Sequence, residues 1–359
     1  MILSKMPLSK SAIISAIRGA FVADASSMGT HWIYDPQEMD KQVPSLEKPE
    51  FKDPPTPSFY SSVEFPGHYG PGMLSPYGEQ LLFVTEHLIA AGGIVDGPTM
   101  SSAMMEWLTN QYTGRKDSAM KTFEENMKNG NVYPNCGADD YQAHCYMKVI
   151  PVACLYAGKP ELLDKVEEAI RVHQNNDVAV SFGCAAALIL ERVLLGKNND
   201  DDDDYATFVE QWNIPPAQDA WRKASTYTDL ESLFLSLSHE LMKGKEDSPF
   251  YNFAARSCAL PGAFIGPVFL LQQNQKQQQQ CLDDTSQNAF TTTIRTNILG
   301  AGDTCSRAIF LGAVVAAAAH DDGDDSSIPE EWIQKMDTAT MERINASAEA
   351  IANLSNATE

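Results

Sequence analysis

Residues 300–319 read GAGDTCSRAIFLGAVVAAAA, a short polar turn followed by a long run of small and apolar side chains. Gly300 and Gly302 permit tight backbone turns, and Asp303 is a residue type that commonly caps helix N-termini. The stretch therefore predicts a buried helix over 304–320 that opens from a polar loop. Free N–H groups at such a helix start attract anions. An ordinary capped core helix would account for the same residues.

The rest of the chain has helical periodicity. Residues 11–28 place Ile13, Ile17 and Phe21 three and four positions apart, as on a helix with one buried face. Strand-like alternation is absent, so the sequence predicts an all-α fold. Further helices are expected over residues 79–92, 99–112, 142–156, 160–173, 178–196, 205–213, 228–243, 259–273, 287–298 and 336–354.

Segments of different composition interrupt this pattern. Residues 36–76 are rich in Pro, Gly, Ser and aromatic residues, which predicts a long ordered loop over the domain. Two low-complexity stretches, 198–204 and 272–280, are interpreted as solvated loop expansions. Helical patterns of one kind continue on both sides of each. Residues 1–359 are therefore interpreted as a single domain.

Charge and cysteine usage limit the partners. The formal net charge of −22 disfavours nucleic acid and anionic membrane surfaces. An anionic ligand would need a local helix N-terminus, a metal or a placed cation. The seven cysteines form no Cys-x-x-Cys pair, and the N-terminus does not resemble a signal peptide. We expect reduced thiols and a cytoplasmic location; the sequence indicates no oligomeric state.

Two further segments combine polar and aromatic side chains. In 24–35, His31 and Trp32 could line a ligand pocket, with the aromatic residue stacking on a base or sugar. They could equally be a core Trp beside a hydrogen-bonded His. In 72–80, Glu79 falls in a first helical turn, where the helix dipole favours a carboxylate whether or not it binds a ligand.

Taken in order, these segments resemble the ADP-ribosylglycohydrolase superfamily, and within it a divergent branch that includes the J-type crystallins of jellyfish lens. The likeness spans roughly residues 11–335. It rests on the segment after Asp24, the helix start near Glu79, the helix with Lys148 and Pro151, the turn at His173, and residues 300–306. The resemblance implies a compact all-α orthogonal bundle of many helices. It also implies a two-magnesium site and hydrolysis of the bond joining ADP-ribose to Arg, Ser or another acceptor.

Both metal-binding loops of that superfamily are altered in this chain. Cys305 stands where the C-terminal loop has its second Asp, and the Thr-Asp-Asp-Thr loop is replaced by a segment whose one carboxylate is Glu79. His31 occupies the place of a family glutamate. Magnesium requires oxygen ligands, so we do not expect two tightly bound magnesium ions. The set His31, Glu79, Asp303 and Cys305 carries donors that softer metals prefer. A zinc- or iron-type ion, weak magnesium and no metal all remain open.

The resemblance implies a hydrolase that acts on an N- or O-glycosidic bond of an ADP-ribosyl or related nucleotide-sugar ligand. In this interpretation Glu79 or Asp303 activates water and His31 assists proton transfer. The partner is a small-molecule or ADP-ribosylated substrate. Residues expected to contact it are Trp32, Tyr77, Lys148, Thr304, Ser306 and Arg307. The alternative is a non-catalytic ligand-binding pseudoenzyme or a crystallin-like structural protein.

Overall fold

A computed structural model describes residues 8–43, 48–55, 60, 64–196, 258–260, 262–264, 266–268, 270–271, 288–319 and 327–357. Within these ranges every regular element is a helix, and β pairing is limited to isolated bridges, which confirms the all-α prediction. The helices are α1 (Lys10–Ser27), η1 (Met28–Thr30), α2 (Pro36–Gln42), α3 (Pro76–Ala90), α4 (Gly97–Asn110), α5 (Ser118–Lys128), η2 (Ala143–Cys145), α6 (Tyr146–Tyr156), α7 (Leu162–Arg171), α8 (Asp177–Leu194), α14 (Ala289–Leu299), α15 (Thr304–Ala318), α16 (Glu330–Ile333) and α17 (Thr338–Ala357).

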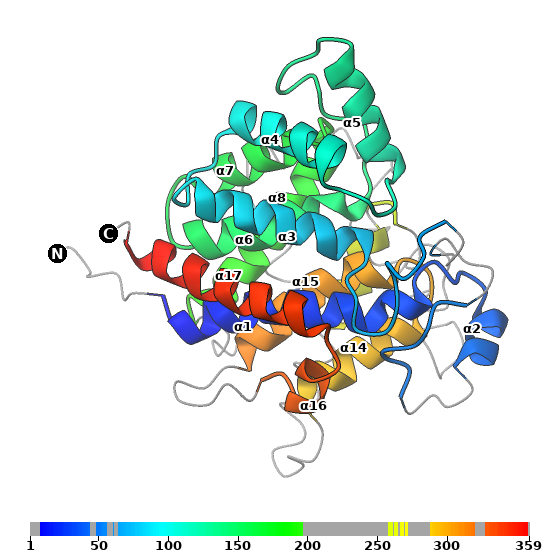
Figure 1. Ribbon diagram of the computed structural model, residues 1–359. Coiled ribbons are helices and arrows are strands. Elements are labelled where there is room, and N and C mark those ends of the chain that lie inside the picture. The colour runs from blue at the N-terminus through cyan, green and yellow to red at the C-terminus, as the bar shows by residue number, and fades with distance from the viewer. Residues whose placement is uncertain are drawn as a thin grey trace, which may run out of the picture.

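Helices α1 and α15 form the most extensive helix–helix contact among these elements and lie side by side in Figure 1. They run antiparallel, because Gly19 faces Gly312 and Ala316 while Ser27 at the end of α1 meets Thr304 at the start of α15. Small side chains at the crossing let the two backbones approach closely. The polar ends of both helices are thereby brought to one place.

Helix α3 delivers a third polar end to the same region. Ser75 caps it: the Ser75 hydroxyl oxygen accepts hydrogen bonds from the backbone N–H groups of Tyr77 and Gly78. Pro76 occupies the first turn, where its missing N–H costs nothing and its fixed φ suits a helix. Helix α3 packs on α1, α6, α15 and α17, and Pro76, Tyr77 and Gly78 of its first turn are buried.

Two expectations about the chain need correction. The segment 36–76 is not loop throughout, since it begins with α2, where Lys41 and Gln42 donate hydrogen bonds to Glu38 one turn earlier. Helix α5 was not predicted. It has few apolar residues among its charged and polar ones. Asp117 caps it by accepting a hydrogen bond from the backbone N–H of Met120.

Several predicted features fall wholly or partly outside the described residues. These are the helices at 205–213, 228–243 and part of 259–273, and the loop expansions at 198–204 and 272–280. The single-domain interpretation stays a prediction. No described helix is both long and apolar enough to span a membrane.

Candidate functional site

His31 and Asp303 meet where α1 ends and α15 begins. His31 follows η1, and its Nε2 atom lies 3.2 Å from Oδ1 of Asp303, with both side chains buried. The hydroxyl of Thr304 donates a hydrogen bond to the carbonyl oxygen of Ser27 at 3.2 Å and joins the two helix ends. The antiparallel packing of α1 and α15 thus creates this pair from residues 272 positions apart in sequence.

The contacts of His31 define its tautomer. The backbone N–H of Cys305 donates to Nδ1 of His31 at 3.2 Å, so Nδ1 has no proton and Nε2 carries one. Burial, followed by the positive charges of Arg307 and Arg115, holds the pKa of His31 well below its usual value. The ring is therefore neutral, with its N–H toward Asp303. The contact is too poorly aligned for a hydrogen bond, and His31 Nε2 and Asp303 Oδ1 have no other partner.

Asp303 occupies the N-cap position of α15 but does not cap the helix, contrary to the sequence expectation. Its Oδ2 accepts a 2.6 Å hydrogen bond from the hydroxyl of Ser306, and burial raises its pKa. The N–H of Thr304 already donates to Gly302, and that of Cys305 to His31. Two of the helix-start donors expected to bind an anion are therefore occupied.

The backbone around the pair is strained. Trp32 and Ala301 have φ values of 65° and 58°, a region that non-glycine residues rarely adopt. The N–H of Trp32 donates to the Gly302 carbonyl at 2.7 Å, and Gly302 donates back to Ile33 at 2.6 Å. Such strain costs about 1–3 kcal/mol per residue and gathers at functional sites.

Arg307 supports this loop from beneath. The buried guanidinium donates to the carbonyl oxygen of Ala301 at 2.6 Å and to Oδ1 of Asn297 at 2.9 Å. The side-chain amide of Asn297 donates in turn to the Thr304 carbonyl. These contacts tie Arg307 to its own loop, whereas the sequence had suggested contact with substrate.

Asp24 is a site residue to which the sequence analysis gave no role. It is fully buried on α1, and its carboxylate accepts hydrogen bonds from the N–H and the hydroxyl of Ser75, at 2.8 and 2.5 Å. Burial raises its pKa to about 7. A Cβ atom at Gly78 would collide with this carboxylate, so glycine is required for the first turn of α3 to lie here.

Glu79 does not join the pair. Its Oε1 lies 2.6 Å from Nε2 of His68, and its Oε2 accepts hydrogen bonds from the hydroxyls of Tyr69 and Tyr112 at 3.3 and 3.1 Å. Gly78 packs on Asp24, and successive helical residues point about 100° apart, so the next side chain turns elsewhere. Glu79 instead lines a separate cavity of about 640 Å³.

The four residues proposed as metal ligands therefore do not form one donor set. The Cys305 thiol points to the backbone oxygen of Asp24 at 3.6 Å, and burial raises its pKa well above the usual value. Across the part of the chain that is described, no group of three His, Cys, Asp or Glu side chains could hold a metal ion. Among the described residues the donors fit neither two magnesium ions nor the soft-metal site that was one of the three alternatives left open.

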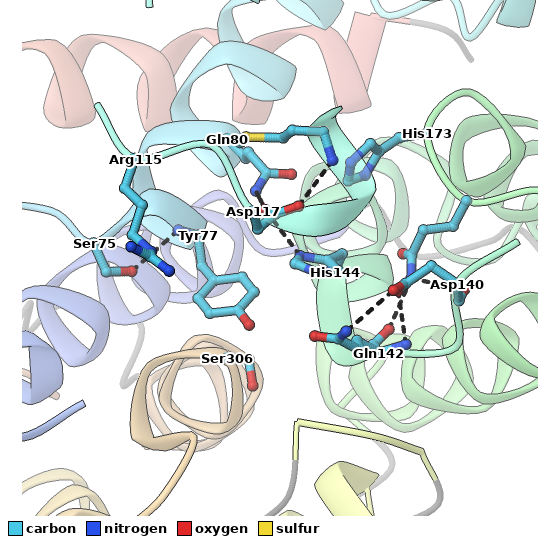
Figure 2. Close-up of polar contacts among 12 residues, drawn as sticks. Ser75, Tyr77, Gln80, Arg115, Asp117, Asp140, Gln142, His144, His173 and Ser306 are labelled. Atoms are coloured by element: carbon cyan, nitrogen blue, oxygen red, sulfur yellow. Dashed lines mark hydrogen bonds and ion pairs between the residues drawn. The ribbon is translucent and has the colours of Figure 1, made fainter. Parts of the chain in front are cut away.

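Tyr77 connects the pair to a second polar cluster. Its buried ring lies 5.5 Å from the ring of His31, edge-on, and 5.0 Å from the ring of His144. Figure 2 shows Tyr77 pointing between Ser306 and His144, with Asp117 close to the histidine and to Gln80. Nδ1 of His144 lies 3.6 Å from Oδ2 of Asp117.

Lys148 belongs to this second cluster. Its Nζ donates to the carbonyl oxygen of His144 at 3.0 Å and lies 2.8 Å from Nδ1 of His173, with all three side chains fully buried. Burial lowers the pKa of Lys148 to about 8. The resemblance had suggested that Lys148 contacts substrate; in this structure its amino group is bound to two protein acceptors.

Further aromatic side chains pack beside His31. The ring of Trp32 lies 4.5 Å from that of His31 and stacks on Tyr60 at 5.6 Å with an interplanar angle of 3°. The guanidinium of Arg115 lies 5.1 Å from the Trp32 ring centroid. Trp32 thus contributes an aromatic wall with a cation beside it.

Comparison with known proteins agrees with the fold. The sequence model of the ADP-ribosylglycohydrolase family matches residues 6–359, and the chain belongs to this family, as the sequence predicted. Among similar proteins of Tripedalia cystophora, Crystallin J1A is 25% identical over 342 residues and Crystallin J1B is 22% identical over 335. Each alignment covers 89% of this chain and 90% of the relative. A solved structure named "ADP-ribosylglycohydrolase-related protein complex" has a TM-score of 0.60 and 16% identity, covering 96% of this chain and 98% of its own.

Proposed function

We propose that this protein hydrolyses the glycosidic bond of an ADP-ribosyl or related nucleotide-sugar ligand, with Asp303 as the base that activates water. The observation that carries the proposal is the buried contact of His31 Nε2 with Asp303 Oδ1, two polar atoms 3.2 Å apart without a well-aligned hydrogen bond. An unsatisfied buried polar group costs about 1–3 kcal/mol. A ligand that used both atoms would offset this cost.

The charge states suit the reaction. The raised pKa of Asp303 makes its carboxylate a stronger base than an exposed one. Because Ser306 holds Oδ2, Oδ1 is the oxygen that would take the proton of the attacking water. The Nε2–H of His31 would orient that water. Family membership supports the substrate class, since the family is named for removing ADP-ribosyl groups.

Access to the pair requires a side chain to move. His31, Asp303 and Tyr77 are each less than 5% exposed. The ring of Tyr77 packs edge-on against His31 and fills the space beside it. We assign to Tyr77 the role of covering the pair in the free protein, and Trp32 the role of stacking a ring of the ligand.

The direct test is release of ADP-ribose from peptides that carry it on Arg or Ser, with and without chelator. We expect turnover by the purified protein and its loss in Asp303→Asn, while Asp139→Asn, an exposed carboxylate variant, retains activity. If the wild-type protein released ADP-ribose from neither the Arg-linked nor the Ser-linked peptide, the proposed hydrolysis would be refuted.

A second candidate is ligand binding without turnover. It is favoured by Glu79, whose two carboxylate oxygens are already engaged by His68, Tyr69 and Tyr112 rather than facing Asp303. In that case calorimetry would detect ADP-ribose binding, Asp303→Asn would weaken it, and no product would form from either substrate.

A further inference from the structure

His144 has two ring nitrogens without a hydrogen-bond partner, although its side chain is fully buried. A buried imidazole normally pairs both nitrogens with protein or bound molecules, because each unpaired group costs about 1–3 kcal/mol. Neither the family resemblance nor the His31–Asp303 pair gives this residue a role. The unpaired imidazole therefore marks a position where a ligand atom would be bound.

Asp117 holds the orientation of His144. Its Oδ1 accepts from the N–H of Met120, and its Oδ2 accepts from the side-chain amide of Gln80 at 3.1 Å. The carboxylate is thus fixed by two donors, with Oδ2 facing Nδ1 of His144 at 3.6 Å. A carboxylate at Nδ1 favours a proton there and leaves Nε2 to exchange a proton with a ligand.

The ring of Tyr77 separates the His144–Asp117 pair from the His31–Asp303 pair. The Tyr77 centroid lies 5.0 Å from the His144 imidazole and 5.5 Å from the His31 imidazole, so both histidines pack against one phenol ring. Figure 2 shows the His144 side of this contact. Movement of Tyr77 would therefore open one space with a carboxylate on one side and an imidazole on the other.

Lys148 and His173 cannot bind a ligand atom in the way inferred for His144. The Lys148 amino group donates to the His144 carbonyl and to Nδ1 of His173. Both residues contact His144: Lys148 through the His144 carbonyl oxygen, and His173 through its ring, 5.5 Å from the His144 ring. They support the histidine, whose imidazole packs against Tyr77.

We propose that His144 is the proton donor to the leaving group in the hydrolysis proposed above, on which this inference rests. The proposed step uses the imidazolium form of His144 and the carboxylate form of Asp303. Water attacks the anomeric carbon and gives one proton to Asp303. The bond to the acceptor nitrogen or oxygen breaks, and that atom keeps the electron pair and takes the Nε2 proton of His144. Exchange with solvent then returns both groups to their starting states.

The test uses two substrates that differ in their need for an acid. One is ADP-ribosyl-serine, whose serine oxygen would leave as a strongly basic alkoxide unless an acid protonates it. The other is ADP-ribose bearing 4-nitrophenolate at the anomeric carbon, which leaves as a stable anion. General acid catalysis contributes about 10²–10⁴-fold, so His144→Gln should lose that factor in kcat on the first substrate and less than about tenfold on the second.

Two further variants keep the test decisive. Asp117→Asn retains His144 and should show the same substrate dependence with a smaller loss, because only the orienting carboxylate is removed. His87→Gln, a half-buried histidine on the same α3 helix as Tyr77, is the matched control and should leave both rates unchanged. Circular dichroism and thermal melting report the folding of each variant.

The outcomes separate the two proposals. Equal losses on both substrates in His144→Gln and Asp117→Asn, or no loss on ADP-ribosyl-serine, would overturn the role of His144 while leaving hydrolysis by Asp303 intact. If the wild-type protein turned over neither substrate, both proposals would be overturned.

Discussion

Gly19 of α1 faces Gly312 of α15 so closely that a Cβ atom on either residue would collide with the backbone carbonyl oxygen of the other. Ala23 and Ala316 flank the contact, so no side chain larger than methyl separates the helices here. This crossing fixes the separation of α1 and α15. It therefore also fixes the distance between His31, just beyond one helix, and Asp303, just before the other.

Gly312→Ala should reduce the free energy of unfolding by at least about 2 kcal/mol, because the added methyl meets backbone that cannot rotate away. Gly70→Ala is the matched control, since a Cβ atom there meets nothing within 4 Å. Urea unfolding followed by circular dichroism measures both. Equal stability of the two variants would show that the helices separate at little cost.

Asp24 should make stability depend on pH. Its folded pKa of about 7 lies above the ordinary 3.8, so the neutral acid stabilises the fold, fully below about pH 4, and this contribution is lost as the pH rises through 7. In Asp24→Asn the side-chain amide would stay neutral at every pH while still pairing with Ser75. This variant should therefore gain stability relative to wild type by roughly 1.4 kcal/mol per pH unit between pH 5 and 7. Parallel stability curves from pH 5 to 8 would contradict the buried acid.

Glu79 should matter less to turnover than Asp303, because its oxygens already accept hydrogen bonds from other side chains. Its hydrogen bond to His68 raises the pKa of that histidine, so the pair stabilises the protein below about pH 6.5 and this is lost as the pH rises through the raised value. Glu79→Gln should return the His68 pKa toward normal in an NMR titration while keeping most activity. Loss of turnover as complete as in Asp303→Asn would make Glu79 the base instead.

The Cys305 thiol should resist alkylation in the native protein. Burial, then the negative charges of Asp24 and Asp303, raise its pKa well above the usual value, and only the thiolate reacts. Iodoacetamide at pH 8 followed by mass spectrometry should leave Cys305 unmodified until urea unfolds the chain. Fast native modification, or one equivalent of zinc that is lost in Cys305→Ser, would restore the soft-metal interpretation.

Most of the described fold followed from local sequence pattern. The helices at 304–320 and 11–28 were predicted within two residues of the bounds of α15 and α1, because long apolar periodicity has one local solution. Helix α5 was not predicted, although Met120, Phe123 and Met127 follow a helical spacing. These apolar residues are few among charged and polar ones, so the short amphipathic segment was missed.

The candidate site was only partly predictable. His31, Asp303, Trp32, Tyr77 and Ser306 were singled out, and the structure brings them together. Asp24 and His144 were not assigned roles. A buried carboxylate inside an apolar helix was a visible signal for the first residue. Nothing in the sequence around His144 indicated that its buried ring nitrogens would lack hydrogen-bond partners.

By itself the sequence determined the all-α class, through its helical period, and the family, through the order of its motifs. The alteration of both metal-binding loops stays a prediction from the resemblance. The tertiary structure alone decided which of the candidate residues meet. In the first turn of α3, Gly78 packs on Asp24, so the next side chain, Glu79, points toward His68. The crossing of α1 and α15 sends His31 to Asp303. The direction in which a side chain points depends on how its helix is rotated and on the distant segments against which the helix packs. Neighbouring residues in the sequence encode neither.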